Sequence, residues 1–378
     1  MTRLQEVDAL RAFALLGIAL ANYPILAQSA QSLLSPAPTV AGQLITAALE
    51  MFVSAKFFVL FSFLFGWGMG VQIASAGRRG VAARGPFLRR LAGLGAIGVA
   101  HALLVFHGDI LVFYAVLGLV LWALRDAPPR RLVQIALVAV VVAIPAYIAL
   151  GYSVAKGLAA LPPDPVGAGY LGGFGEATAQ RARDWPPALW FVLLFNGPLA
   201  LSAFCAGLAA QKAGLFDPGS AQWGRLCCAV PWLVAVGLAT NLTHMVAFGA
   251  ILDGTQAPLV ASLGFAALGL GAPTLGLVYL WAVVEAARRW GVPAWMAAAG
   301  GMSATIYVGQ GVLGGLVFNG YGLGLYDSLS PPLVALVACG ATVLLFAAAA
   351  LWARAFGQGP LERLLRAVTR GGPSQPSA

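Results

Sequence analysis

The segment GVAHALLVFHGDILVFYAVLG, residues 98–118, places two histidines and an aspartate in a sequence otherwise suited to hydrocarbon. A titratable side chain in a membrane span costs about 2.5–3.5 kcal/mol on insertion scales, so such residues are rare and usually functional. His101 can take a proton from a hydroxyl or amine nucleophile and return it to a leaving group. Asp109 can hold that imidazole in the required tautomer, as the carboxylate of a serine-protease triad does. We therefore predict a catalytic pair, with a hydrogen-bonded structural histidine as the alternative.

Other polar side chains in apolar segments extend the candidate site. Lys56, which we add to the catalytic candidates, either reaches the headgroups or pairs with a carboxylate such as Asp109 or Glu50. Asp8 and Arg11 share a helix face at i, i+3 spacing, where they form a structural pair or present Arg11 to an anionic ligand from the cytoplasm. The candidate substrate contacts are polar residues expected toward the outer half: Asn22, His107 (expected to face water or headgroups), Tyr114 and Gln310.

The composition requires a membrane protein built around these groups. Hydrophobic residues make up 60% of the chain, charged residues 9%, and the mean hydropathy is +0.86. Each span needs roughly 20 apolar residues, and backbone polar groups in lipid must be satisfied within a helix. We therefore predict an all-α polytopic protein of about ten transmembrane helices, over residues 8–27, 50–75, 86–106, 109–125, 131–152, 187–212, 222–250, 260–285, 296–317 and 331–354. Lys56 would then lie about two helical turns from the outer end of its span.

The distribution of lysine and arginine predicts the orientation. If the N-terminus is cytoplasmic, 17 of the 22 basic residues lie inside and three outside, while Arg11 and Lys56 lie within spans. This is the bias of the positive-inside rule, so we predict that both termini are cytoplasmic. The net charge of +9 follows from the same bias and requires no nucleic-acid partner. Arg89 and Arg90, in the inner segment RRGVAARGPFLRR, either bind the phosphate groups of a cytoplasmic ligand or are only part of this topology signal.

Three further features complete the predicted organisation. Residues 1–355 form one membrane domain in contact with lipids, 356–370 an amphipathic helix on the inner leaflet, and 371–378 a disordered tail. The connection at 153–186 is long, rich in Gly and Pro, and external, which is typical of functional or disordered loops. The cysteines lie in apolar spans without metal-type spacing, so no metal is expected.

Several blocks resemble the YeiB-like family of bacterial inner-membrane proteins, and they cover nearly the whole chain. These blocks are EVDALRAFALLGIALANY, KFFVLFSFLFGWG, RRLAGLGAIGVAHALLVFHGDILVFYAVLG, GGMSATIYVGQG, GYGLGLYD and GQGPLERLLRAVTRG. The first block is similar to the LDxLRG-type block of the transmembrane acyltransferase superfamily, which includes heparan-glucosaminide acetyltransferase. The chain departs from the pattern at Ala12, where the family has glycine, at Gly301, where it has arginine, and at Ile306, where it has asparagine.

The resemblance implies transfer of an acyl group from cytoplasmic acyl-CoA, as the donor substrate, to an acceptor at the other face by a membrane-embedded histidine. In this chain that histidine is His101, and the implied location is the bacterial inner membrane. The alternatives are a transporter or flippase for a small anionic metabolite or lipid-linked precursor, and a non-catalytic membrane subunit. The acceptor and the formation of a homodimer are left open.

Overall fold

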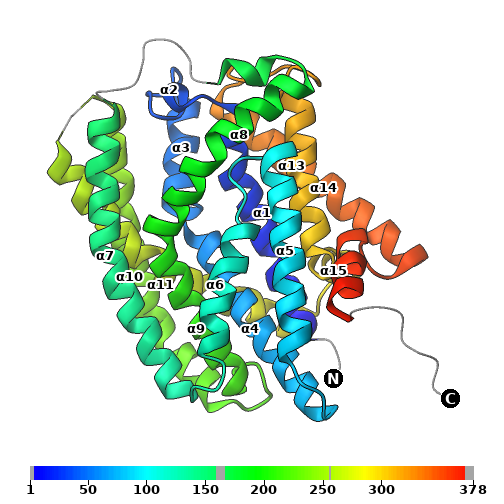
Figure 1. The fold of residues 1–378 in the computed structure, drawn as a ribbon. Coiled ribbons are helices and arrows are strands. Elements are labelled where there is room, and N and C mark those ends of the chain that lie inside the picture. Colours follow the sequence, from blue (N-terminus) through cyan, green and yellow to red (C-terminus); the bar gives the residue numbers. More distant parts are fainter. Residues whose placement is uncertain (1–3, 159–166, 255–256, 371–378) are drawn as a thin grey trace.

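The computed structural model describes residues 4–158, 167–254 and 257–370, and every regular element in them is helical, which confirms the all-α class (Figure 1). In chain order the helices are α1 (Gln5–Ala27), α2 (Ala30–Leu33), α3 (Val40–Phe52), α4 (Lys56–Arg78), α5 (Arg84–Leu104), α6 (Leu111–Ala123), α7 (Pro129–Leu158), η1 (Ala168–Leu171), α8 (Phe174–Phe191), η2 (Val192–Asn196), α9 (Gly197–Lys212), α10 (Ala221–Leu252), α11 (Pro258–Trp290), α12 (Ala294–Gly301), α13 (Ser303–Phe318), α14 (Pro331–Phe356) and α15 (Pro360–Arg370).

The number of complete membrane crossings is lower than the ten expected. In the described residues, eight helical segments are long and apolar enough to span, or nine if the bent pair α12–α13 forms one span. The prediction of a span at 109–125 is wrong because α6 has only 13 residues. Such a helix is about 20 Å long, whereas the hydrocarbon core is about 30 Å thick. Residues 109–110 and 124–125 of the predicted span lie outside the helix, and the connection from α5 at residues 105–110 is not helical.

A break between α3 and α4 changes the predicted position of Lys56. Residues 40–49 were expected to be a connection, but they are part of α3. Lys56 therefore lies 16 residues, or about 24 Å, from the start of α3. Ala55 at the break has φ of +65°. The carbonyl groups freed there are satisfied, because Lys56 Nζ donates to the Glu50 carbonyl at 2.6 Å and the Tyr279 hydroxyl donates to the Phe52 carbonyl at 2.8 Å.

A second break bends α12 against α13 by 84°. It frees the first amides of α13, and the Glu362 carboxylate of α15 accepts hydrogen bonds from the amides of Ala304 at 2.8 Å and Thr305 at 3.2 Å. The C-terminal helix therefore completes the backbone hydrogen bonding of a membrane helix. It also packs along α5, where Leu365 and Val368 lie over Gly93.

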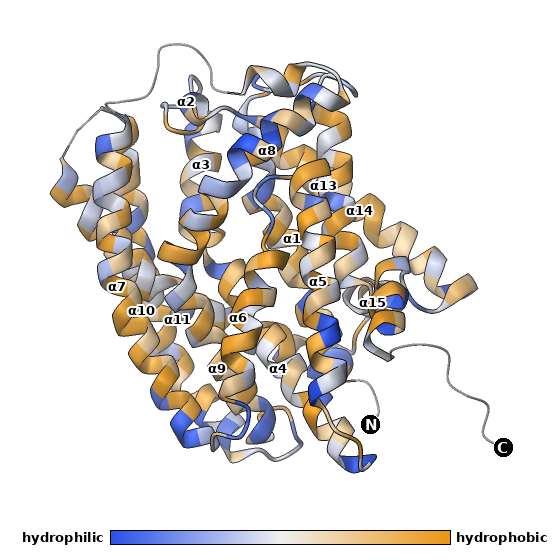
Figure 2. Ribbon diagram, in the orientation of Figure 1, coloured by the Kyte–Doolittle hydropathy of each residue, from blue (hydrophilic) through white to orange (hydrophobic). Residues whose placement is uncertain are grey.

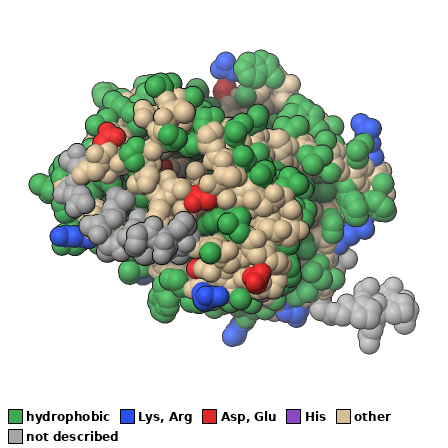
Figure 3. Space-filling model, turned by 90° about the horizontal axis from the view of Figure 1, so that it is seen from above, with side chains coloured by type: hydrophobic (Ala, Val, Ile, Leu, Met, Phe, Trp, Pro, Cys, Tyr) green, Lys and Arg blue, Asp and Glu red, His purple; other side chains and the backbone are tan. Residues whose placement is uncertain are grey.

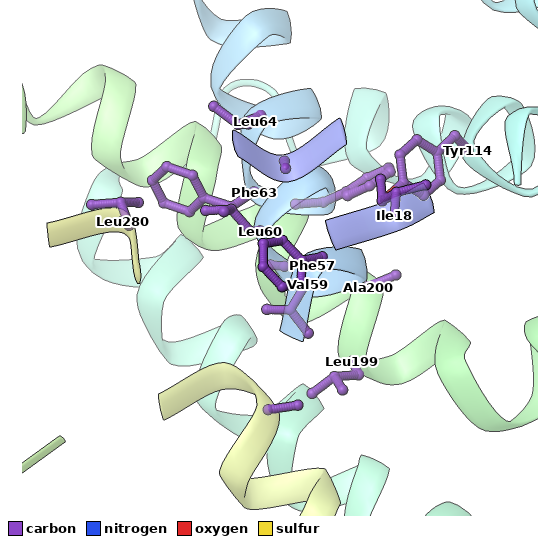
Figure 4. Packing of buried hydrophobic residues seen from close by; sticks show 14 of the residues in the cluster. Ile18, Phe57, Val59, Leu60, Phe63, Leu64, Tyr114, Leu199, Ala200 and Leu280 are labelled. Atoms are coloured by element: carbon purple, nitrogen blue, oxygen red, sulfur yellow. The ribbon is translucent and has the colours of Figure 1, made fainter. Parts of the chain in front are cut away.

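The core forms where α1, α4, α9 and α11 meet, and Figure 4 shows residues of this cluster. Two glycines let α4 and α9 approach closely. A Cβ atom on Gly66 would lie 2.0 Å from the Phe204 carbonyl oxygen, and one on Gly207 would lie 2.0 Å from the Phe63 carbonyl oxygen. Small residues at such positions allow two membrane helices to pack with their backbones in contact.

The two ends of the bundle differ in polarity. Figure 2 shows hydrophilic residues at the lower ends of α4, α5 and α7 and along α8, which crosses the upper end. Viewed from above, the upper face is mostly hydrophobic or uncharged, and Lys and Arg lie near its edge (Figure 3). Much of the loop expected at residues 153–186 is helical, because α7 reaches residue 158 and α8 starts at residue 174. The tail at 371–378 lies outside the described residues, and cytoplasmic termini stay a prediction.

Candidate functional site

His101 and Asp109 form a buried hydrogen-bonded pair. His101 lies in the last turn of α5, and its Nδ1 is 2.8 Å from Asp109 Oδ1. The exposed fractions of the two side chains are 1% and 0%. Because a carboxylate only accepts hydrogen bonds, Nδ1 carries the proton and Nε2 of the neutral ring is an acceptor. The pair therefore has the arrangement of a general base with its orienting carboxylate.

The turn between α5 and α6 places Asp109 in this position. Its second oxygen, Oδ2, accepts hydrogen bonds from the amides of Leu111 at 2.7 Å and Val112 at 3.1 Å, the first two residues of α6. A Cβ atom on Gly98 would lie 2.9 Å from that oxygen, so a glycine is needed for α6 to approach α5. The carboxylate is thus fixed by the start of α6 and cannot turn away from His101.

The free nitrogen of the pair faces a small cavity. His101 Nε2 has no hydrogen-bond partner among the described residues. The cavity has a volume of about 10 Å³ and is lined by Ala19, Asn22, Tyr23, Leu26, His101, Phe106, Tyr307, Gln310 and Gly311. A Cβ atom on Gly311 would lie 2.6 Å from Nε2, so the absence of a side chain there leaves the nitrogen open. A buried imidazole with one free nitrogen can move a proton at this point.

Two predicted substrate contacts, Asn22 and Gln310, line this cavity. Gln310 Nε2 donates to the Leu15 carbonyl and to Thr342 Oγ1, both at 3.1 Å, which leaves its amide oxygen Oε1 without a partner in the described chain. The sequence analysis missed Tyr23, whose hydroxyl donates to the Gln310 carbonyl at 2.9 Å. Tyrosines are common in apolar spans, so only the fold distinguishes this one.

A larger cavity of about 410 Å³ lies at the lower ends of α1, α4 and α9. Arg11 lines it and donates to Asp8 Oδ1 at 3.0 Å, as the i, i+3 spacing predicted. Asp217 and Gln211 are also part of its wall. Its volume is in the usual range for a small-molecule site. Eleven residues of α1, or about 16 Å, separate Arg11 from Asn22 at the upper cavity.

The remaining predicted residues lie apart from the His101 cavity. Tyr114 forms a hydrogen bond with Ser62 Oγ at 2.7 Å inside the core. Arg89 donates to the Thr369 carbonyl of α15 at 2.9 Å, and Arg90 is close enough to Arg11 to interact electrostatically. The structure thus brings Arg90, but not Tyr114, close to Arg11.

Lys56 belongs to a different buried cluster at the break between α3 and α4. Its Nζ donates to the backbone carbonyl of Glu50 and not to the carboxylate considered from sequence; that carboxylate lies 2.9 Å from His244 Nε2 of α10. The exposed fraction of the His244 side chain is 1%, and its Nδ1 has no partner in the described residues. Glu50 and His244 are 194 residues apart in sequence, so no spacing pattern could have paired them.

His107, which was expected to face water or headgroups, is half-buried in a polar layer beneath α8. The Tyr170 hydroxyl donates to Asp184 Oδ2 at 2.7 Å, so His107 Nδ1 donates to the phenol oxygen at 2.9 Å. Burial lowers the pKa of His107, as does the nearby Arg181 charge, against the opposing effect of Asp184. None of these groups forms a metal-type cluster in the described chain.

Comparison with known proteins identifies uncharacterised bacterial relatives. Over 343 residues the chain is 28% identical to the uncharacterized protein YxaH of Bacillus subtilis, covering 85% of this chain and 81% of YxaH. It is also 28% identical over 390 residues to the uncharacterized protein YeiB of Escherichia coli, covering 98% and 97% of the two chains. No solved structure matches the chain.

A family model covers the C-terminal part. Residues 210–372 match the family described as "Protein of unknown function (DUF418)". The resemblance to YeiB-like proteins is thereby confirmed, whereas the comparisons provide no activity. Residues 210–372 thus resemble the DUF418 family, and the chain is similar to YeiB and YxaH over most of its length.

Proposed function

We propose that this polytopic protein is an acyltransferase of the bacterial inner membrane, which transfers an acyl group from cytoplasmic acyl-CoA to an acceptor at the opposite face. The observation that carries the proposal is the buried His101–Asp109 pair, whose free Nε2 opens onto a cavity. A buried ionisable pair within a membrane domain is costly unless it is used. The resemblance of the first sequence block, EVDALRAFALLGIALANY, to the LDxLRG-type block of transmembrane acyltransferases supports the same reaction class.

The proposed reaction needs one general base that takes up a proton and later returns it as a general acid. His101 Nε2 accepts the proton of an acceptor hydroxyl or amine while the oxygen or nitrogen attacks the thioester carbonyl carbon. The carbon–sulfur bond then breaks, and the departing sulfur takes the proton from the imidazolium. The products are an ester or amide and free coenzyme thiol. Asp109 holds the Nδ1 proton throughout and stabilises the charged ring, while the free Oε1 of Gln310 can bind a donor group of the acceptor.

The donor would enter from the cavity at the lower ends of α1, α4 and α9. Arginine binds phosphate with a forked donor geometry, so we assign Arg11, with the nearby Arg90, to the coenzyme phosphates. The pantetheine arm would extend along α1 toward Asn22, over the distance of about 16 Å that separates the two cavities. In this assignment the acyl group crosses the membrane interior along one helix.

The test compares two buried histidines that each bind a carboxylate. Membranes from cells that express the wild-type chain, His101→Gln or His244→Gln are incubated with acyl-CoA labelled in the acyl group, and labelled products are separated by chromatography. We expect His101→Gln to lower product formation by at least about 100-fold, whereas His244→Gln retains it. Equal labelling by wild type and His101→Gln, at equal amounts of folded protein, would refute the proposal.

A second candidate function is ion-coupled transport, which is favoured by the cluster of Glu50, Lys56 and His244. Interrupted helices with buried charges at the break are typical of transporter binding sites. If the chain is a transporter, His244→Gln abolishes uptake of a labelled anionic solute into proteoliposomes, while His101→Gln leaves it intact. The two variants therefore give opposite patterns for the two candidate functions.

A further inference from the structure

Arg181 is an arginine buried beneath the outer surface, although it lies on the most polar of the long helices, α8. Its exposed fraction is 1%. The guanidinium donates to the Leu104 carbonyl at the end of α5, at 3.1 Å, and to the Tyr321 hydroxyl at 3.0 Å. It also lies 6.0 Å from the ring centre of Tyr170 and 5.7 Å from that of Tyr321. All these partners are uncharged.

A carboxylate partner for Arg181 is absent from the described residues. Asp184, one turn further along α8, accepts hydrogen bonds from Tyr170 at 2.7 Å and Gln180 at 3.0 Å. Buried arginines are rarely left without an anion, because desolvation of the charge is otherwise uncompensated. The direct contacts of this guanidinium are all uncharged, and Asp184 is engaged by other donors, which leaves room for an anion from outside the described chain to complete the site.

The position of Arg181 relates it to the catalytic pair. It lines a cavity of about 10 Å³ with His107, Tyr170 and Asn319, and two residues of that wall, Leu26 and Phe106, also line the His101 cavity. Phe106 is thus part of the shared wall, and its ring centre lies 6.3 Å from that of His101 and 5.4 Å from that of His107.

We propose that Arg181 binds an oxyanion, a carboxylate or phosphate, of the acceptor. The inference rests on the proposed acyltransferase function and defines the class of its acceptor. Leu104, which Arg181 contacts, follows His101 by three residues, or about 4.5 Å along the axis of α5, so Arg181 and His101 meet the same end of that helix. One acceptor can therefore place its anionic group at Arg181 and its hydroxyl or amine at His101. The cavity has room for about one water, so α8 must move outward as the acceptor enters.

The experiment measures binding and does not require acyl-CoA. The full chain in detergent is titrated calorimetrically with glycerol 1-phosphate and, as the matched neutral probe, glycerol. The same protein in phosphatidylcholine nanodiscs with or without phosphatidic acid tests a lipid phosphate. Binding of the soluble probe indicates a free anionic acceptor, and binding of phosphatidic acid alone indicates a lipid headgroup.

The variants separate an anion site from a structural role. Arg181→Gln should weaken binding of the phosphate probe by at least about 10-fold, whereas Arg183→Gln, an exposed arginine on the same helix, should leave it unchanged. Arg181→Lys keeps a cation near the end of α5 if Arg181→Gln does not fold, and should also weaken binding because it lacks the forked geometry.

Each outcome bears on the inference. If neither phosphate probe binds the wild-type chain, or if the folded Arg181 variant binds like Arg183→Gln, the anion site is refuted and Arg181 only anchors α8. If Arg181-dependent binding is found but no acyl-CoA supports transfer, the proposed function fails while the anion site remains. If transfer occurs and does not depend on Arg181, only the present inference fails.

Discussion

Replacing Asp109 by asparagine tests the tautomer that the structure assigns to His101. Asp109 Oδ2 faces two backbone amides, of Leu111 and Val112, which can only donate. The asparagine must therefore place its amide oxygen there and turn its NH₂ group toward His101 Nδ1. That nitrogen then has to accept a hydrogen bond, so the proton moves to Nε2 and the base is lost.

The magnitude follows from the cost of the opposite amide orientation. Turning the NH₂ group toward the two backbone amides leaves two buried donors unsatisfied, at about 1–3 kcal/mol each. At a minimum of about 2 kcal/mol, only roughly one molecule in 30 keeps Nε2 free. We therefore expect acyl transfer by Asp109→Asn to fall between about 30-fold and the roughly 10⁴-fold loss seen when a triad carboxylate is amidated.

The assay measures acyl transfer at equal amounts of folded protein, with thermal unfolding as the check on folding. Glu50→Gln is the matched control, because Glu50 also binds a buried histidine but lies at the α3–α4 break. The control should retain transfer. If about one molecule in 30 keeps Nε2 free, Asp109→Asn cannot retain nearly full activity. Acyl transfer by this variant within about threefold of wild type would therefore show that the His101 tautomer does not determine the rate.

Three further predictions follow from individual contacts. Gly311→Ala places a methyl group 2.6 Å from His101 Nε2, so this variant should lower acyl transfer about 100-fold. Gly340→Ala is the control, because Gly340 has open space around it, and it should keep the wild-type rate. Equal rates of acyl transfer by the two variants would contradict a role for the cavity. Burial lowers the pKa of His107, so the unfolded chain binds a proton more readily and stability should fall as pH drops below about 6.5. His107→Phe should flatten that fall in thermal unfolding between pH 8 and 5, and an unchanged slope would assign it elsewhere. Glu362→Ala removes the cap of α13 and should lower the free energy of unfolding by about 1–2 kcal/mol. Proteolysis of α15 should also become faster. Protection of α15 equal to wild type would mean that the cap does not hold this helix.

The hydrogen bond between His101 and Asp109 could be predicted from sequence because the two residues are close in the chain. His101 and Asp109 are eight residues apart across a turn at Gly108, and no third element is needed to bring them together. The long apolar helices were predictable for a similar local reason. Their hydropathy is continuous, and lipid leaves the backbone few alternatives.

The environment of Lys56 could not be predicted because it depends on contacts between distant segments. Gln43 and Glu50 interrupt the apolar pattern of residues 40–52, so this segment resembled a connection. In the structure it forms α3 and extends the candidate span to Val40–Arg78, which places Lys56 deep in the bundle. The partner of Glu50 is His244, on a helix far along the chain. Hydropathy describes one helix at a time and does not identify such neighbours.

The polar layer beneath α8 was missed for a different reason. Residues 174–185, FGEATAQRARDW, have the composition of an exposed loop. They form a helix because Arg181 and the Tyr170–Asp184 pair find polar partners at the ends of α5 and α13. Such burial depends on tertiary contacts, and the composition of the segment alone predicts exposure.

The shortness of α6 constrains how the protein is made. At 13 residues it is a weak signal for insertion by the translocon, and the backbone of residues 105–110 is tolerable in lipid only when protein surrounds it. The segments that cover this backbone, α8 and α13, are synthesised later. The ribosome must therefore complete most of the chain before the hairpin of α5 and α6 reaches its final depth, and truncated nascent chains that end before α13 should leave residues 105–110 accessible to aqueous labelling reagents.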